Sequence, residues 1–232
     1  MTERSPRLLV IAPHPDDEVL GVGGIMARYA HAGGEVTVLT VAAHMPPLYT
    51  EDVHQQTVRE AKKAHALLGI KESIFFDNPA VLLGEISAPK FNGEIKDVVD
   101  RVCPDVVLLP YSDRHADHRL VFDAAMVATR PVGKTQSLKL VAAYETLSET
   151  HWNAPHFEPN FTPNCTIDVT DFIDTKLEAM SCYQSQLHAF PAPRSLEALK
   201  ALALFRGSQA GMGYGEGLHI LRMTAGLEVL TG

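Results

Sequence analysis

Short, largely apolar runs alternate with segments of helical periodicity along the first 145 residues of the chain. The runs are "RLLVIA" (7–12), "EVTVLTVA" (35–42), "SIFF" (73–76), "DVVLLP" (105–110) and "LKLVAAYE" (138–145), and such runs are typical of buried parallel strands. Helical segments over about 18–34, 52–68, 88–102 and 116–129 separate them. The alternation predicts an α/β fold: a Rossmann-like three-layer sandwich with a mostly parallel sheet and helices on both faces.

The pattern changes after residue 146. A loop rich in proline and asparagine (148–164) precedes a strand-like "CTIDV" (165–169), helices over about 170–183 and 195–206, and a glycine-rich connection to a final strand. No stretch has the composition of a linker, and 232 residues suffice for one large domain with a substantial core. We therefore predict a single domain over residues 1–232 with an elaborated C-terminal part.

Composition narrows the classes of partner. The net charge is −8 and no cluster of lysine or arginine is visible, which argues against nucleic acid and against anionic membranes as partners. The three cysteines are far apart and odd in number, as expected in a reducing compartment. The first residues do not resemble a signal peptide and no apolar run reaches membrane-spanning length, so we expect a cytoplasmic protein without a membrane anchor.

Two polar motifs follow predicted strands. "HPDDE" (14–18) comes after the first strand, and "YSDRHADHR" (111–119) comes after the fourth. In open α/β sheets, ligands bind beyond the carboxyl ends of the strands, so both motifs are expected on the same edge. Either motif alone has an ordinary structural explanation, such as acids complementing a helix N-terminus. Together they supply two imidazoles and a carboxylate, a set that leaves an open position as catalytic zinc sites do.

These motifs resemble the "AHPDDE" and "HxDH" signatures of the PIG-L/LmbE family of metal-dependent N-deacetylases. The resemblance extends to "REAKKAHALLGI", to "IDVTDFIDTKLEAMSCYQSQ" and to "GMGYGEGLHILR", and so covers most of the chain. It implies a hydrolase that removes the acetyl group from an N-acetylated amino sugar, with one Zn²⁺ per chain or another divalent ion such as Fe²⁺. The family likeness is also compatible with a homo-oligomer.

Residue roles follow from the resemblance position by position. It implies that His14, Asp17 and His118 are the metal ligands and that Asp16 is the general base. It further implies that His115 faces the reacting carbonyl. In the expected reaction Asp16 accepts the proton of a metal-activated water, and a protonated His115 helps to stabilise the tetrahedral oxyanion. Asp117 is expected to orient His115 and to keep it charged.

The substrate contacts are expected elsewhere on the same edge. The candidates are Arg59, Asp77, Tyr144 and Glu145. Arg59 has a solvated helix arginine as its alternative interpretation, and Asp77 is the nearest acid to a position that often contacts substrate in the family. The stretch "VAAHMPPLYTED" (41–52) lacks the glycine-rich segment common in the family. The sequence therefore leaves open whether the substrate is a monosaccharide glycoside, a nucleotide sugar, a chito-oligosaccharide or a glycolipid, of which the glycolipid is the least favoured because no basic or apolar surface segment is visible.

The motifs of other functional classes fit this sequence less well. A dinucleotide-binding oxidoreductase is disfavoured because "GVGG" does not give the G-x-G-x-x-G spacing, and a serine hydrolase lacks its G-x-S-x-G elbow. A metal-dependent phosphoesterase is more credible, since the same ligands serve phosphate transfer, although it commonly needs a second metal. A non-catalytic sugar-binding protein stays open as well, but binding alone requires neither Asp16 nor His115.

Overall fold

Five parallel strands form the centre of the molecule. The computed structural model describes residues 4–154 and 156–224. Its first five strands are β1 (Arg7–Ala12), β2 (Glu35–Thr40), β3 (Glu72–Phe75), β4 (Val106–Pro110) and β5 (Leu140–Tyr144). They lie in the order β3-β2-β1-β4-β5 and all pair in parallel. The mostly parallel sheet predicted from the apolar runs is confirmed, and β1, whose carboxyl end carries the first motif, lies beside β4, whose carboxyl end carries the second.

The C-terminal part adds two strands to this sheet, and both pair in antiparallel orientation. β7 (Gly215–Met223) pairs antiparallel with β5, and β6 (Cys165–Asp168) pairs antiparallel with β7. The complete order is β3-β2-β1-β4-β5-β7-β6. Gly215 and Gly217, which we interpreted as part of a tight-turn connection, lie inside β7. The reason is close packing, because a Cβ at Gly215 would lie 2.6 Å from a side-chain atom of Thr166 on β6.

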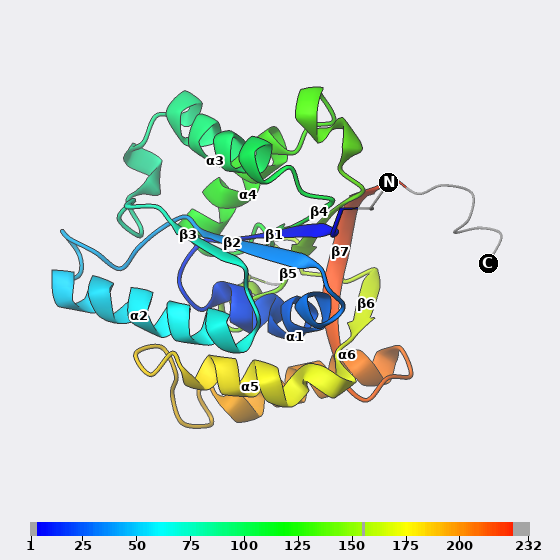
Figure 1. Ribbon diagram of the computed structural model, residues 1–232. Helices are drawn as coiled ribbons and strands as arrows, with labels where there is room; N and C mark the ends of the chain where they lie inside the picture. Colours follow the sequence, from blue (N-terminus) through cyan, green and yellow to red (C-terminus); the bar gives the residue numbers. More distant parts are fainter. Residues whose placement is uncertain (1–3, 155, 225–232) are drawn as a thin grey trace.

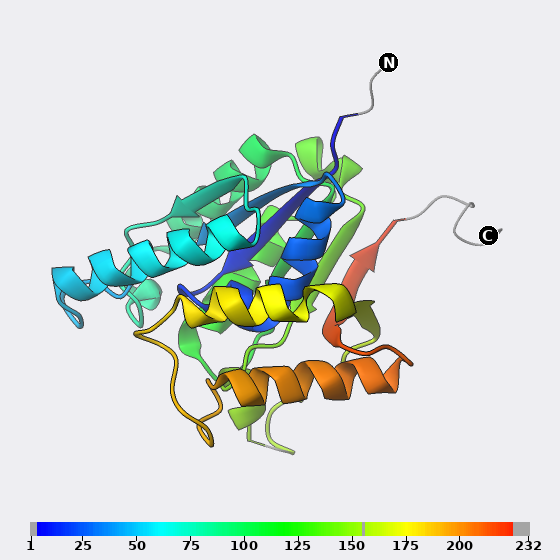
Figure 2. The same ribbon diagram turned by 60° about the horizontal axis from the view of Figure 1, so that its bottom comes forward.

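Helices cover both faces of the sheet (Figures 1 and 2). On one face lie α3 (Ala88–Val102) and α4 (Ala116–Ala128), and on the other lie α1 (Asp17–His31), α2 (Glu51–Leu67), α5 (Ile173–Ser181) and α6 (Leu196–Gln209). Short 3-10 helices occupy Leu83–Glu85 (η1), Gly133–Ser137 (η2), Glu149–Trp152 (η3) and Thr170–Phe172 (η4). The helix predicted over 170–183 is thus divided between η4 and α5. None of the helices in the described part of the chain has the length and apolar character needed to cross a membrane.

The core divides into two clusters, one on each face of the sheet. Along β1, Leu8 and Val10 pack into the cluster on the side of α1 and α5, whereas Leu9 and Ile11 pack into the cluster on the side of α3 and α4. Successive side chains of a strand point to opposite faces, so an uninterrupted apolar run is required when both faces are covered. This is why the predicted strands contain so few polar residues.

The helix after the first motif is interrupted. Val22 has φ −137° and ψ 26°, so α1 consists of two helical pieces that meet at this residue. The Glu216 carboxylate of β7 accepts hydrogen bonds from the amides of Gly24 (2.9 Å) and Ile25 (2.7 Å), which begin the second piece. The Lys176 ammonium of α5 pairs with Glu216 and donates to the Leu20 carbonyl (3.0 Å), near the end of the first piece. A buried ion pair thereby supplies the partners that the interrupted helix lacks.

Candidate active site

The two motifs meet at the carboxyl ends of β1 and β4. Asp16 is the residue that precedes α1, and His115 is the residue that precedes α4. Because β1 and β4 are neighbours in the sheet, the turns that follow them lie side by side. The histidine rings confirm this arrangement: the centroid of His14 lies 4.6 Å from that of His115 and 5.5 Å from that of His118.

Asp17 lies between two histidines. Its Oδ2 atom is 3.2 Å from His14 Nδ1 and 3.3 Å from His118 Nε2, and all three side chains are buried. Burial by itself would raise the pKa of the Asp17 carboxyl, but the charges and hydrogen bonds of His118 and His14 hold that pKa well below its ordinary value. The structure thus brings together the three residues that the resemblance implies as ligands.

His115 completes a second grouping at the same point. One ring nitrogen from each of His14, His115 and His118 lies within 4.8 Å of the others, a spacing that a single metal ion spans. The sequence-based set contained Asp17 instead of His115. Four side chains therefore surround the candidate metal position. The geometry is compatible with two sets of three ligands, one with Asp17 and one with His115 beside His14 and His118.

The unpaired atoms of this cluster fit a divalent cation. Within the described residues, Asp17 Oδ1 is buried and has no hydrogen-bond partner, and the buried His118 Nε2 has only the charge contact with Asp17 Oδ2 (3.3 Å). The surrounding acids are buried too: Asp16, Asp17, Glu18, Asp113 and Asp117. Buried charges need a counter-charge, and imidazole with carboxylate is a donor set that Zn²⁺ and Fe²⁺ accept. The residues present therefore fit the ion that the two motifs predict.

Asp16 has an unusual backbone. Its φ is 118° and its ψ −30°, a region that residues other than glycine rarely adopt, and its amide donates to Glu18 Oε2 (3.3 Å). Glu18 in turn accepts hydrogen bonds from the Tyr183 hydroxyl and from His65 Nε2 (3.2 Å). Burial, together with the charges of Asp17 and Glu18, raises the pKa of the Asp16 carboxyl to about 7. The turn thus presents a buried carboxyl that is distinct from the Asp17 carboxyl.

His115 and Asp117 are arranged differently from the expectation. The Asp117 carboxylate does not bond to the His115 ring; its Oδ2 atom is 2.9 Å from His14 Nε2 and accepts from the Val81 amide (2.7 Å). The His115 ring is instead oriented by the Asp117 amide, which donates to His115 Nδ1 (3.1 Å). Burial and the neighbouring histidines lower the pKa of His115 to about 4. In this arrangement His115 is neutral and carries its proton on Nε2.

Asp113 is a site residue that the sequence interpretation missed. Its Oδ2 atom lies 2.9 Å from His118 Nδ1 and accepts from the Thr150 hydroxyl (2.9 Å), while its Oδ1 atom accepts from the His115 amide (2.9 Å). Burial lowers the pKa of His118, but the charge of Asp17 and the hydrogen bond with Asp113 overcome this and raise that pKa to about 10. A carboxylate behind a ligating histidine is a recurrent feature of metal sites. The signal was an acid two residues before His115.

Arg194 is a second residue that the sequence analysis missed. It belongs to the loop between α5 and α6, and its Nη1 atom donates to Asp16 Oδ2 (3.2 Å). Its Nη2 atom lies 3.5 Å from Glu149 Oε1 in η3. No motif marks this arginine, because its loop lacks helical or strand periodicity and lies 178 residues from Asp16 in sequence.

The four candidate substrate residues occupy different environments. Tyr144 is fully buried and donates its hydroxyl hydrogen to the Ile11 carbonyl (2.9 Å). Glu145 is also buried, and its two carboxylate oxygens pair with Arg206 (2.7 Å each) and with His151 (3.1 Å). Arg59 is exposed on α2, and Asp77 is exposed after β3. Their roles toward a substrate stay predictions.

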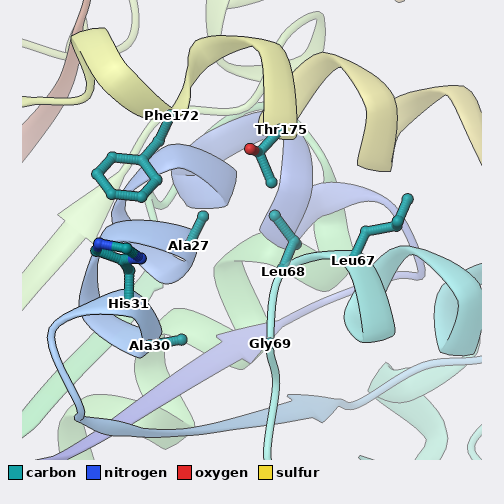
Figure 3. Close-up of a pocket in the computed structure, with 8 residues that line it drawn as sticks. All are labelled: Ala27, Ala30, His31, Leu67, Leu68, Gly69, Phe172 and Thr175. Atoms are coloured by element: carbon teal, nitrogen blue, oxygen red, sulfur yellow. The ribbon is translucent and has the colours of Figure 1, made fainter.

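A cavity of about 370 Å³ lies away from the motifs (Figure 3). It lies between the ends of α1 and α2 and the start of α5, and it is lined by Ala27, Ala30, His31, Leu67, Leu68, Gly69, Phe172 and Thr175. None of these residues belongs to either motif. The cavity therefore adds nothing to the cluster at the carboxyl ends of β1 and β4.

Comparison with known proteins decides the family. The PIG-L family, described as GlcNAc-PI de-N-acetylase, matches residues 9–129, which is more than half of the chain and includes both motifs. The chain belongs to the PIG-L family. It is accordingly an N-deacetylase, a hydrolase. A diacetylchitobiose deacetylase of Thermococcus kodakarensis is similar, with 27% identity over 93% of this chain and 83% of the relative.

Solved structures show that this PIG-L fold serves more than one reaction. The deacetylase Dbv21, which acts on the A40926 pseudoaglycone, superimposes with a TM-score of 0.76 at 22% identity, over 96% of this chain and 100% of that chain. GalB of Pseudomonas putida, a 4-carboxy-2-hydroxymuconate hydratase, superimposes with a TM-score of 0.74 at 22% identity, over 96% and 99% of the two chains. At these identities the likeness shows the fold alone.

Proposed function

We propose that this protein is a zinc-dependent hydrolase that removes the acetyl group from the amide nitrogen of an N-acetylated amino sugar of the N-acetylglucosamine type. The observation that carries the proposal is the position of Asp17 between His14 and His118, where the Asp17 Oδ1 atom is buried and has no hydrogen-bond partner among the described residues. The resemblance to a diacetylchitobiose deacetylase supports an acetylated sugar as the substrate.

His14, Asp17 and His118 would hold the metal. A bound Zn²⁺ supplies Lewis acidity, which lowers the pKa of water and polarises the carbonyl of the amide. Asp113 orients His118 through its Nδ1 atom, and Asp117 does the same for His14 through its Nε2 atom. The protein therefore fixes the rings of both histidines with carboxylates that are not needed as ligands.

Asp16 and His115 have different roles in the reaction, one in proton transfer and the other in hydrogen bonding. Asp16 Oδ2 is engaged by Arg194, so its Oδ1 atom accepts the proton of the attacking water. The neutral His115 donates the proton on its Nε2 atom as a hydrogen bond to the oxygen of the tetrahedral intermediate. The amine leaves when it receives the proton that Asp16 holds. The products are acetate and a free amino sugar.

Two measurements on the purified protein test this proposal. Elemental analysis should find one divalent ion per chain, and N-acetylated sugars should release acetate and a free amine.

Asp16→Asn keeps a residue that tolerates positive φ, so we expect it to retain the metal and to lose activity by about 10²–10⁴-fold. Undiminished acetate release by this variant would remove Asp16 from the role of base. Release of phosphate without acetate from an N-acetylated sugar phosphate would favour a phosphoesterase.

The same measurements separate the two sets of ligands. If Asp17 is a ligand and His115 is not, Asp17→Asn should lose the metal and His115→Ala should retain it. The reverse result would assign the site to the three imidazoles. His54→Ala is a suitable control, because His54 lies on α2 and takes part in neither grouping.

A further inference from the structure

We propose that Arg194 is a positioning residue, whose guanidinium holds the Asp16 carboxylate in the orientation that proton transfer requires. The inference rests on the proposed function, because it concerns the residue that acts as base there. Neither the first motif nor the second contains Arg194. Its contribution comes from the loop between α5 and α6, in the C-terminal part of the chain.

Arg194 connects three separate segments at the site. Its Nη1 atom donates to Asp16 Oδ2 (3.2 Å) in the turn after β1 and lies 3.4 Å from Gln186 Oε1 at the start of its own loop. Its Nη2 atom lies 3.5 Å from Glu149 Oε1 in η3. The side chain of Arg194 is 22% exposed, and that of Asp16 is 1% exposed. The pair is therefore largely shielded from water, where charged hydrogen bonds are strong.

Asp16 needs an external partner because its neighbours repel it. Asp17 and Glu18 follow directly in the sequence, and both are buried. Glu18 accepts the Asp16 amide and so holds the backbone of the turn, but it leaves the Asp16 side chain free to rotate. The contact from Arg194 fixes one carboxylate oxygen of Asp16. The other oxygen is then presented in one direction, away from the contact with Arg194.

The charges around Arg194 argue against a primary role in binding an anionic substrate. Its guanidinium already faces two carboxylates, those of Asp16 and Glu149. An anionic substrate would have to compete with both acids for one cation. Two different nitrogens of the planar guanidinium face the two acids, a span that an arginine side chain reaches more readily than a lysine ammonium.

A double-mutant cycle tests the pairing without any substrate. The melting temperatures of wild type, Arg194→Met, Asp16→Asn and the double variant should be measured on metal-loaded protein. If the pair exists in solution, Arg194→Met should lower the melting temperature more in the wild type than in the Asp16→Asn background. Equal shifts in both backgrounds would overturn the contact on which the proposal rests.

Kinetics then test the positioning role. We expect Arg194→Met to bind one metal ion and to lower kcat by about 10²-fold with little change in KM, because misplacing a reacting group by about 1 Å costs on that order. Arg194→Lys should recover part of the loss. Arg101→Met serves as the control. Arg101 pairs with Glu72 (2.7 Å) at the amino end of β3, whereas the site lies at the carboxyl ends of β1 and β4, so this variant should leave kcat unchanged.

The outcomes are distinguishable. A rise in KM with unchanged kcat would show that Arg194 binds substrate and would overturn the positioning role. Loss of metal from Arg194→Met would show that the arginine acts on the ligands, which also contradicts the proposal. A wild-type protein that binds metal and releases no acetate would overturn the proposed function and the positioning role together, while the melting-temperature cycle would still report whether the pair exists.

Discussion

His118 is oriented by a carboxylate from the loop between β4 and α4. Asp113 lies 2.9 Å from His118 Nδ1 and is itself held by the Thr150 hydroxyl (2.9 Å). This arrangement fixes the ring and directs its Nε2 atom toward Asp17. At the scale of single residues, the geometry of the site therefore depends on Asp113, a side chain that contacts a proposed metal ligand and is not itself a proposed ligand.

We predict that Asp113→Asn weakens metal binding by about 10–100-fold, the usual effect of removing such a partner. Competition with a chelator of known affinity measures the change. Asp123→Asn is the matched control, because Asp123 is exposed on α4 and should leave the affinity unchanged. An Asp113→Asn variant with wild-type affinity would show that the carboxylate only holds the turn.

At the scale of elements, the interruption of α1 is supported by charge. Lys176 and Glu216 are both buried and provide the partners for the two helical pieces that meet at Val22. The first piece begins directly after Asp16, so its direction sets the position of the first motif. The ion pair is therefore part of the framework that places the ligands, although it lies outside the site.

We predict that Lys176→Met lowers the free energy of unfolding by about 3–5 kcal/mol, because it leaves the Glu216 carboxylate buried without its counter-charge. Urea unfolding measures this change. Lys90→Met removes an exposed lysine that lies near Glu94, and it should cost less than about 1 kcal/mol. A loss of similar size in the two variants would contradict the stabilising role of the buried Lys176–Glu216 pair.

At the scale of the whole molecule, Glu145 connects the sheet with two distant segments. It directly follows β5 and pairs with Arg206 of α6 and with His151 of η3. Burial by itself would raise the pKa of the Glu145 carboxyl, but the hydrogen bonds from His151 and Arg206 lower that pKa below its ordinary value of 4.5. The pairing consequently stabilises the fold above pH 4.5, and this contribution is lost as the pH falls through the lower pKa of the folded state.

We predict that Glu145→Gln is less stable than wild type at pH 7 and that the difference shrinks as the pH falls below 4.5. Urea unfolding of both proteins at a series of pH values between 7 and 3 gives the difference directly. A difference that stays constant over this range would show that the Glu145 charge contributes nothing to stability.

The sequence predicted those parts of the molecule that depend on local patterns. The order and length of the apolar runs predicted the parallel strands, and the two motifs follow β1 and β4, which the topology makes neighbours. Arg194 was not predictable, because its contact with Asp16 spans 178 residues and depends on where an irregular loop folds back. The prediction that Asp117 orients the His115 ring was wrong for a similar reason, since the groups that contact the Asp117 carboxylate, the Val81 amide and the His14 ring, come from other loops.

The backbone of Asp16 has a consequence for directed evolution. Residue 16 adopts φ 118°, which glycine accepts without steric cost and aspartate does not, and it buries a carboxyl among other acids. Replacing Asp16 with glycine should relieve both penalties while removing the base. Selection for heat resistance alone would therefore enrich inactive sequences at this position. A library built from this protein has to be screened for turnover and for stability together.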